Sequence, residues 1–245
     1  MTSLLILGAT SGIARAYIDR VASEFEKIVL VARDAEKLSQ LSAHVETISS
    51  ASVEVITADL ADSSKHEALV SIVAGKVNSI DCALVAYGVL TDQSRCASDA
   101  KYAMEQFNLN GTSTISLSLY LAQQMVSQGG GTLAVIGSVA GDRGRRSNYC
   151  YGSAKSAVES CLAGLRSEMQ KRKVHVLTIK PGFVDTPMTS EIKKGALWAS
   201  ADKVATDIDT AIKKKKNILY TPWFWRYIML VIKSIPEFIF KKLPL

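Results

Sequence analysis

Short apolar runs alternate with longer segments of helical periodicity along most of the chain. Six runs, each of about six residues, read as buried strands: residues 2–7, 27–32, 53–58, 81–86, 132–137 and 175–180. The intervening segments, among them residues 100–127 and the stretch that ends near residue 172, predict helices. Buried strands that alternate with helices are typical of a parallel sheet covered on both faces. The sequence therefore predicts an α/β protein with one doubly wound sheet.

The first apolar run leads through a glycine-containing turn into a helical pattern. A strand, a glycine turn and a helix N-terminus together present free backbone N–H groups to a pyrophosphate. Gly8 would form the tight turn, and Gly12 would let the phosphates approach the backbone. We therefore predict a Rossmann-type dinucleotide site that includes Gly8, Thr10, Ser11, Gly12 and Ile13.

A second stretch carries a candidate catalytic set. Tyr151 and Lys155 are four residues apart at a predicted helix start, so their side chains lie on one face. Ser138 follows a strand, at the sheet edge where α/β proteins bind ligands. A neighbouring ammonium favours the phenolate. We predict Tyr151 as the acid or base, Lys155 as its activator and Ser138 as a hydrogen-bond donor to the reacting oxygen.

Together the two motifs resemble the short-chain dehydrogenase/reductase family over residues 2–188. In that family the glycine pattern binds a nicotinamide dinucleotide, and a Ser, Tyr, Lys set moves the substrate proton during hydride transfer. An asparagine completes the set. The family's N-L-x-G segment matches residues 108–111, so the resemblance implies that Asn108 is the catalytic asparagine, and not Asn110.

The resemblance also implies further cofactor contacts. The residues after the third and fourth strands would face the adenine and the ribose, although residues 85–88 read V-A-Y-G where the family has N-N-A-G. The segment after the sixth strand would hold the nicotinamide carboxamide, and residues 189–199 would form a substrate lid. The implied cofactor residues are Asp59, Leu60, Gly88, Tyr151, Lys155, Pro181, Gly182, Val184 and Thr186.

Arg33 indicates which dinucleotide binds. An acid at the end of the second strand binds a ribose 2′-OH, whereas an arginine accommodates a 2′-phosphate. Ala32-Arg33 lacks the acid, which favours NADPH, with NADH as the alternative. We expect Asp34 to be a helix N-cap. The alternative interpretation is that Arg33 is a solvated loop residue.

Three arginines, Arg143, Arg145 and Arg146, lie between Ser138 and Tyr151. Guanidinium groups bind phosphate with two parallel hydrogen bonds, so the cluster predicts an anionic keto substrate. The alternative is that these arginines are solvated or pair with another subunit.

The net charge of +6 is concentrated at the C-terminus. From residue 213 onward there are eight basic residues against one acid, Glu237, so diffuse nucleic-acid binding is a poor explanation. We divide the chain into a catalytic domain, residues 1–221, and an apolar, basic tail, residues 222–245. Arg226, Lys233 and Glu237 would form one polar stripe on the tail helix. Tryptophans and flanking lysines favour a helix in the membrane interface, and packing on the core or on a second subunit is the alternative.

The four cysteines show no metal-ligand spacing and are expected to be free thiols, with no metal site. The first apolar run is too short for a secretory signal. We therefore expect the protein on the cytoplasmic side, peripheral on the inner membrane, as a homo-oligomer.

The arginine cluster, the V-A-Y-G variant and the tail resemble a narrower group within the family, the reductases of decaprenylphosphoryl-2-keto-pentose. That likeness implies a keto-sugar on a polyprenyl phosphate, in cell-envelope glycan biosynthesis, with a separate oxidase as partner. Two alternatives remain: a reductase of a soluble ketone or acyl thioester whose tail serves oligomerisation, and a non-catalytic dinucleotide-binding protein.

Overall fold

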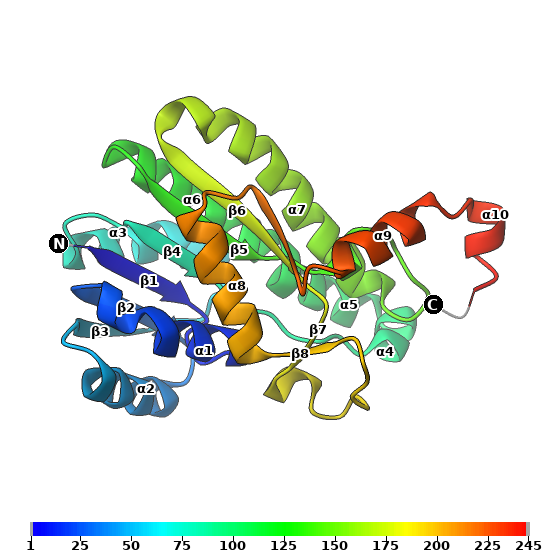
Figure 1. Ribbon diagram of the computed structural model, residues 1–245, viewed down its shortest axis with the longest axis horizontal. Coiled ribbons are helices and arrows are strands. Elements are labelled where there is room, and N and C mark those ends of the chain that lie inside the picture. The colour runs from blue at the N-terminus through cyan, green and yellow to red at the C-terminus, as the bar shows by residue number, and fades with distance from the viewer. Residues whose placement is uncertain (1, 244–245) are drawn as a thin grey trace.

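A seven-stranded parallel sheet forms the centre of the molecule (Figure 1). The computed structural model describes residues 2–243. The strand order is β3-β2-β1-β4-β5-β6-β9. The strands are β1 Ser3–Leu7, β2 Lys27–Ala32, β3 Ser52–Thr57, β4 Cys82–Val85, β5 Gly131–Ile136, β6 Val174–Pro181 and β9 Ile218–Thr221. The order reverses between β1 and β4, which is where such sheets bind ligands. The predicted fold class is confirmed.

Helices cover both faces of the sheet because its strands are apolar on both sides. One core packs α1 Gly12–Val21, α2 Ala35–Ile48 and α8 Ala201–Lys213 against one face. The other core packs α3 His66–Lys76, α6 Ser113–Ser127 and α7 Tyr149–Met169 against the opposite face. The shorter helices α4 Gln93–Ser98 and α5 Ala100–Phe107 lead to α6 through a π-helical turn, Asn108–Thr112.

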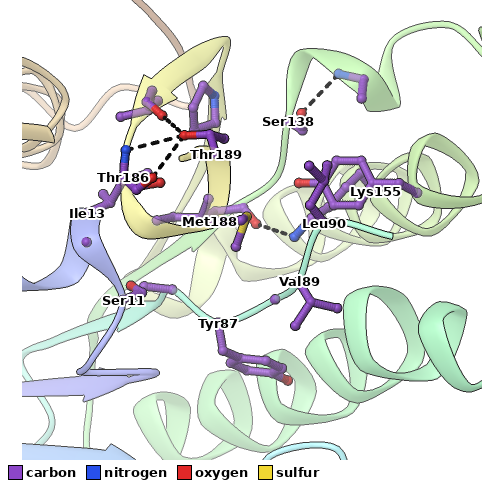
Figure 2. Close-up of a pocket in the computed structure, with 18 of the residues that line it drawn as sticks. Ser11, Ile13, Tyr87, Val89, Leu90, Ser138, Lys155, Thr186, Met188 and Thr189 are labelled. Atoms are coloured by element: carbon purple, nitrogen blue, oxygen red, sulfur yellow. Dashed lines mark hydrogen bonds between the residues drawn. The ribbon is translucent and has the colours of Figure 1, made fainter. Parts of the chain in front are cut away.

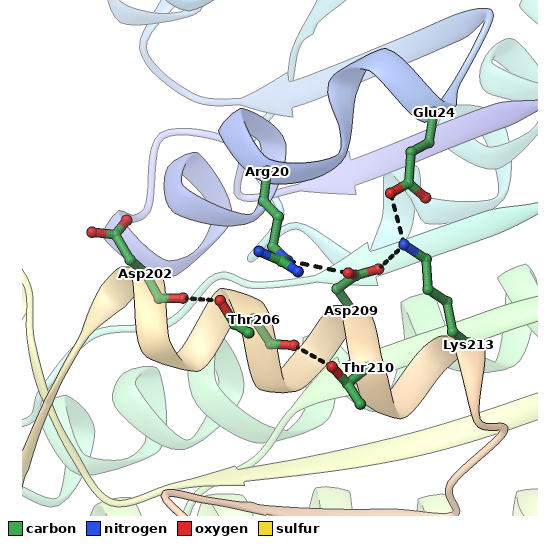
Figure 3. A network of polar contacts seen from close by, with 7 residues as sticks. All are labelled: Arg20, Glu24, Asp202, Thr206, Asp209, Thr210 and Lys213. Carbon is green, nitrogen blue, oxygen red and sulfur yellow. Dashed lines mark hydrogen bonds and ion pairs between the residues drawn. The ribbon is translucent and has the colours of Figure 1, made fainter.

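A polar network holds α8 against α1 (Figure 3). Asp209 is buried and accepts hydrogen bonds from Arg20 Nε at 3.1 Å and from Lys213 Nζ at 2.9 Å. Lys213 also pairs with Glu24 at 2.7 Å. A buried carboxylate with two cationic partners is compensated for its lost hydration. The network fixes the helix that leads into β9.

The tail begins where β9 ends and contains two helices, α9 Trp225–Ser234 and α10 Glu237–Phe240. Trp225 and Met229 are buried one helical turn apart and pack with Val139. Pro236 separates the two helices, so Glu237 does not continue a polar stripe with Arg226 and Lys233 as we predicted. No helix within residues 2–243 is long and apolar enough to span a bilayer.

The opposite side of the tail is exposed. Large apolar side chains there leave more than half of their area uncovered: Trp223, Tyr227, Leu230, Val231 and Phe238. One side of the tail therefore packs on the core, as one of the two alternatives predicts, and the large apolar side chains of the other side are exposed.

Candidate active site

A cavity of about 650 Å³ lies at the C-terminal edge of the sheet, across the point where the strand order reverses. The predicted cofactor residues Gly8, Thr10, Ser11, Gly12, Ile13, Arg33, Asp59, Leu60, Gly88, Pro181, Gly182, Val184 and Thr186 all line it. Ser138, Tyr151 and Lys155 line it as well. Figure 2 shows Ser11 and Ile13 near Thr186, and Ser138 near Lys155, around one space. The structure thus brings the two sequence motifs together.

The glycine turn is shaped for a ligand that contacts backbone. Gly8 has a φ of +84°, and a Cβ there would lie 2.7 Å from Tyr87 Cβ. A Cβ on Gly12 would lie 2.9 Å from Thr186 Cγ2. Ser11 caps α1 by accepting from Ala14 N at 3.3 Å. Both glycines thus allow close packing around the turn that leads into α1. The first backbone N–H groups of a helix have no intrahelical partner, so this end of the cavity fits a pyrophosphate.

The end of β2 and the segment after β6 complete this half of the cavity. Arg33 is exposed and lines it, whereas Asp34 caps α2 by accepting from Lys37 N at 3.0 Å, as predicted. After β6, Val184 O and Thr186 N both bond to Thr189 Oγ1, at 2.6 and 3.3 Å. This segment also contains the small parallel pair β7 Phe183–Asp185 and β8 Trp198–Ser200.

Tyr151 and Lys155 lie on one face of α7, as their spacing predicts. Lys155 is only 2% exposed, and its Nζ donates to Ile136 O at 3.1 Å and lies 5.7 Å from the centre of the Tyr151 ring. Burial lowers the pKa of Lys155 to about 8, although the nearby Glu159 charge raises it. Lys155 therefore carries its charge at neutral pH and loses it just above.

The pKa of Tyr151 shifts in the direction opposite to our expectation. Burial raises the pKa of Tyr151 to about 12, and a hydrogen bond with Ser138 lowers it only in part. The ammonium of Lys155 does not overcome the desolvation of the phenolate. Tyr151 therefore holds its proton at neutral pH, which suits a group that donates a proton.

Ser138 is fixed by a buried charge network that the sequence analysis missed. Ser138 N donates to Glu159 Oε1 at 3.0 Å, and Glu159 Oε2 pairs with Lys180 Nζ at 2.7 Å. Lys180 also pairs with Asp142 at 2.6 Å, and Asp142 accepts from Tyr220 at 2.9 Å. Glu159 stands one turn beyond Lys155 on the same helix face, which is the signal that could have found it.

The side chain of Asn108, the predicted catalytic asparagine, does not line the cavity. Asn108 Nδ2 donates to Ala61 O at 2.9 Å, and its Oδ1 accepts from Thr112 at 2.6 Å, so its side chain joins the π-helical turn to the loop after β3. Asn110 is fully buried, and its Oδ1 accepts from Val89 N at 3.0 Å.

Gly88 places Asn110 next to the catalytic lysine. A Cβ on Gly88 would lie 2.8 Å from Asn110 Oδ1 and 3.6 Å from Lys155 Nζ. The π-helical turn thus brings the side chain of Asn110, rather than that of Asn108, next to Lys155.

The V-A-Y-G variant has its own packing. Tyr87 points away from the cavity, and its hydroxyl bonds to Ser113 Oγ on α6 at 3.1 Å (Figure 2). This bond ties the end of β4 to α6, which offsets the loss of the amide at that position.

The three arginines have three different environments. Arg143 donates to Ile232 O at 2.7 Å and to Ile235 O at 2.6 Å, pairs with Glu237 and covers the Phe240 ring at 3.7 Å. Arg143 is therefore occupied with the tail and is not free for a substrate phosphate. Arg146 is exposed and does not line the cavity, whereas Arg145 does.

The comparisons with known proteins agree with the geometry. The family model described as short chain dehydrogenase matches residues 2–197. An uncharacterized oxidoreductase of Mycobacterium tuberculosis is 31% identical over 98% of this chain and 96% of its own length. Another, from Streptomyces coelicolor, is 28% identical over 98% and 95%. The chain belongs to the short-chain dehydrogenase family and is an NAD(P)-dependent oxidoreductase.

Solved structures share the fold. A short-chain dehydrogenase from Sphingobium yanoikuyae in complex with NADPH has a TM-score of 0.82 and 24% identity, over 97% of each chain. A short-chain dehydrogenase from Burkholderia cenocepacia in complex with NADP has a TM-score of 0.83 and 16% identity, over 100% of this chain and 98% of that one. At such identities the likeness establishes the fold alone.

Proposed function

We propose that this protein is an NADPH-dependent ketoreductase. The observation that carries the proposal is the meeting of Ser138, Tyr151 and Lys155 in one cavity with the glycine turn of α1. A bound reduced nicotinamide supplies the hydride for a carbonyl carbon. Tyr151 donates its phenolic proton to the carbonyl oxygen, and Ser138 hydrogen-bonds to that oxygen. Lys155 and Asn110 lie behind Tyr151, where they support return of the proton.

NADPH is the cofactor that Arg33 favours. The side chain lines the cavity directly after β2, and no acid takes the place that would bind a ribose 2′-OH. The two solved neighbours above were determined with NADPH and NADP, which supports the same choice. NADH remains the alternative.

The substrate that we propose is a keto-sugar carried on a polyprenyl phosphate. The support is the resemblance to the reductase component of decaprenylphosphoryl-ribose 2′-epimerase, together with a tail that joins the cavity wall to an exposed apolar surface. In that system a separate flavin oxidase forms the ketone, so we propose an oxidase partner here too. The role would lie in cell-envelope glycan biosynthesis.

The exposed side of the tail is proposed to rest on the cytoplasmic face of the inner membrane. A groove between β9 and α9 is lined by Trp223, Tyr227 and Leu230 and by three cations, Lys216, Arg226 and Lys233. None of the three cations forms an ion pair within residues 2–243. Exposed aromatics with unpaired cations suit a surface of anionic lipid.

A reduction assay tests the chemistry. NADPH consumption is measured with a polyprenyl-phosphate keto-sugar beside soluble ketones and an acyl thioester. We expect the lipid-linked sugar to give the highest kcat/KM and Tyr151→Phe to abolish most turnover. Higher kcat/KM with a soluble substrate would refute the lipid-linked substrate and leave the reductase.

Vesicle flotation tests the membrane contact. Removing residues 222–245 would also uncover Val139, which packs against Trp225 and Met229. The better variant is therefore Trp223→Ser with Leu230→Ser, both on exposed positions. Wild type should float with anionic vesicles and the double variant should not. If neither protein floats, and wild type is a dimer or tetramer that the double variant turns into a monomer, the surface serves oligomerisation instead.

A further inference from the structure

Unpartnered polar atoms are concentrated around the cavity. Among residues 2–243, six buried side-chain polar atoms have no hydrogen-bond partner. Four of them belong to residues that line this cavity: Thr91 Oγ1, Arg145 Nε, Asn148 Oδ1 and Trp225 Nε1. A buried polar group without a partner costs about 1–3 kcal/mol, so native proteins contain few. Four around one space indicate a ligand that pairs with them.

The two strongest members are donors. The guanidinium of Arg145 and the indole N–H of Trp225 cannot accept hydrogen bonds, so a ligand must bring oxygens to them. Arg145 forms no ion pair with a described residue, although Asp142 is near enough to act on its charge. Asp59 is the one carboxylate among the residues that line the cavity, and it lies beyond β3 at the dinucleotide end. Asp142 is engaged by Lys180 and Tyr220, so Arg145 has no ion-pair partner of its own among the residues that line the cavity.

The tail holds Trp225 in the cavity wall. Trp225 is 3% exposed, its ring meets Phe183 edge-on at 5.7 Å, and a Cβ on Gly182 would lie 1.8 Å from its Nε1. Gly182 thus leaves room for the indole next to the predicted nicotinamide loop. Arg143, two residues before Arg145, caps the end of α9 through Ile232 O and Ile235 O. The arginine loop is therefore joined to the tail helix, and each contributes a residue to the cavity wall, Arg145 and Trp225.

We propose that Arg145 and Trp225 form a subsite for an anionic oxygen group of the substrate, a carboxylate or a phosphate. Asn148 and Thr91 would form hydrogen bonds with hydroxyl groups elsewhere on the same substrate. The proposal rests on the proposed ketoreductase function and specifies its substrate class: ketones with an anionic group within reach of the carbonyl. The tail therefore contributes Trp225 to the substrate site and also presents an exposed apolar surface.

A matched pair of ketones tests the subsite. The probes are 4-oxocyclohexanecarboxylate and 4-methylcyclohexanone, which share a ring and differ in charge. Binding to the enzyme saturated with NADPH is followed by NADPH fluorescence, and reduction by NADPH consumption. Wild type should prefer the carboxylate about ten- to hundredfold in both Kd and kcat/KM, since hydrogen bonds to charged groups are of that strength.

Two variants and two controls locate the effect. Arg145→Gln should remove most of the preference, and Trp225→Phe, which keeps an aromatic ring, should reduce it about threefold or more. Arg146→Gln removes the charge of the next residue in the chain, whose side chain is exposed, and Trp223→Phe changes an exposed tryptophan. Both controls should keep the wild-type preference. Thermal unfolding of each variant confirms that it is folded.

The outcomes separate this inference from the proposed function. Equal binding of the two ketones by wild type would overturn the subsite. An equal loss of the preference for the carboxylate in Arg145→Gln and Arg146→Gln would overturn it too. Reduction of both ketones without preference would leave the ketoreductase standing and refute the subsite. Preferential binding of the carboxylate with no reduction of either ketone would support the subsite and refute the ketoreductase function.

Discussion

The two halves of the cavity are built in different ways. The dinucleotide half comes from β1, β2 and the start of α1, and it offers mainly backbone groups shaped by Gly8 and Gly12. The substrate half comes from the segment after β5, from α7 and from the tail, and it offers side chains, several without partners. A common cofactor can be held by backbone geometry, whereas a particular substrate needs particular side chains. Changes in the two halves should therefore have different consequences.

The largest effect is expected from Tyr151→Phe. The variant keeps the ring and removes the proton donor, so kcat should fall about 10²- to 10⁴-fold while NADPH binding stays close to wild type. Steady-state kinetics and a cofactor titration measure the two quantities. A variant that turns over within a factor of a few of wild type would show that another group donates the proton.

Asn110→Ala should lower kcat more than Asn108→Ala does. Removing the Asn110 side chain leaves the half-buried Val89 N–H without its partner beside Lys155. We therefore expect kcat to fall about ten- to hundredfold, with about 1–3 kcal/mol lost from the free energy of unfolding. Asn108→Ala breaks contacts outside the cavity and should reduce stability more than turnover. The opposite order of kcat values would restore Asn108 as the catalytic asparagine.

The pH dependence of ketone reduction should follow Lys155. Its pKa of about 8 lies below the usual lysine value, so the ammonium is present below pH 8 and is lost as the pH rises through it. Tyr151, with a pKa of about 12, keeps its proton over that range. We expect kcat/KM to fall about tenfold per pH unit above pH 8. A profile that stays flat to pH 10 would contradict this role for Lys155.

The smallest effect is expected in the dinucleotide half. Arg33→Ala should weaken NADPH binding about three- to tenfold and leave NADH binding nearly unchanged, because only NADPH carries a 2′-phosphate for the guanidinium. Fluorescence titration with both cofactors gives the ratio. Equal weakening of NADPH and NADH binding in the variant, or tighter NADH binding by wild type, would show that Arg33 is a solvated loop residue.

The sheet was predictable because its strands are short, apolar on both faces and followed by helices. Six of the seven strands were placed to within one or two residues. β9 was missed because its four residues form an edge strand of mixed burial, which has no periodicity of its own. The free cysteines that we expected are also found.

The candidate site residues that share one helix were predictable from their spacing, and those that are brought together by the fold were not. Tyr151 and Lys155 have a helical spacing, and Ser138 ends a strand. Asn110 needed the π-helical turn to be known. Trp225 comes from 74 residues beyond Tyr151 in the sequence, and only packing against Phe183 and Gly182 brings it to the cavity.

Deuteride transfer tests the central claim most directly. The protein is incubated with a panel of ketones and NADPH that is deuterated at both C4 positions, and the alcohols are analysed by mass spectrometry. The account predicts one deuterium on the carbinol carbon with wild type and at least a hundredfold less labelled product with Tyr151→Phe. Bound cofactor with no labelled alcohol from any ketone, or equal labelling by the two proteins, would contradict it.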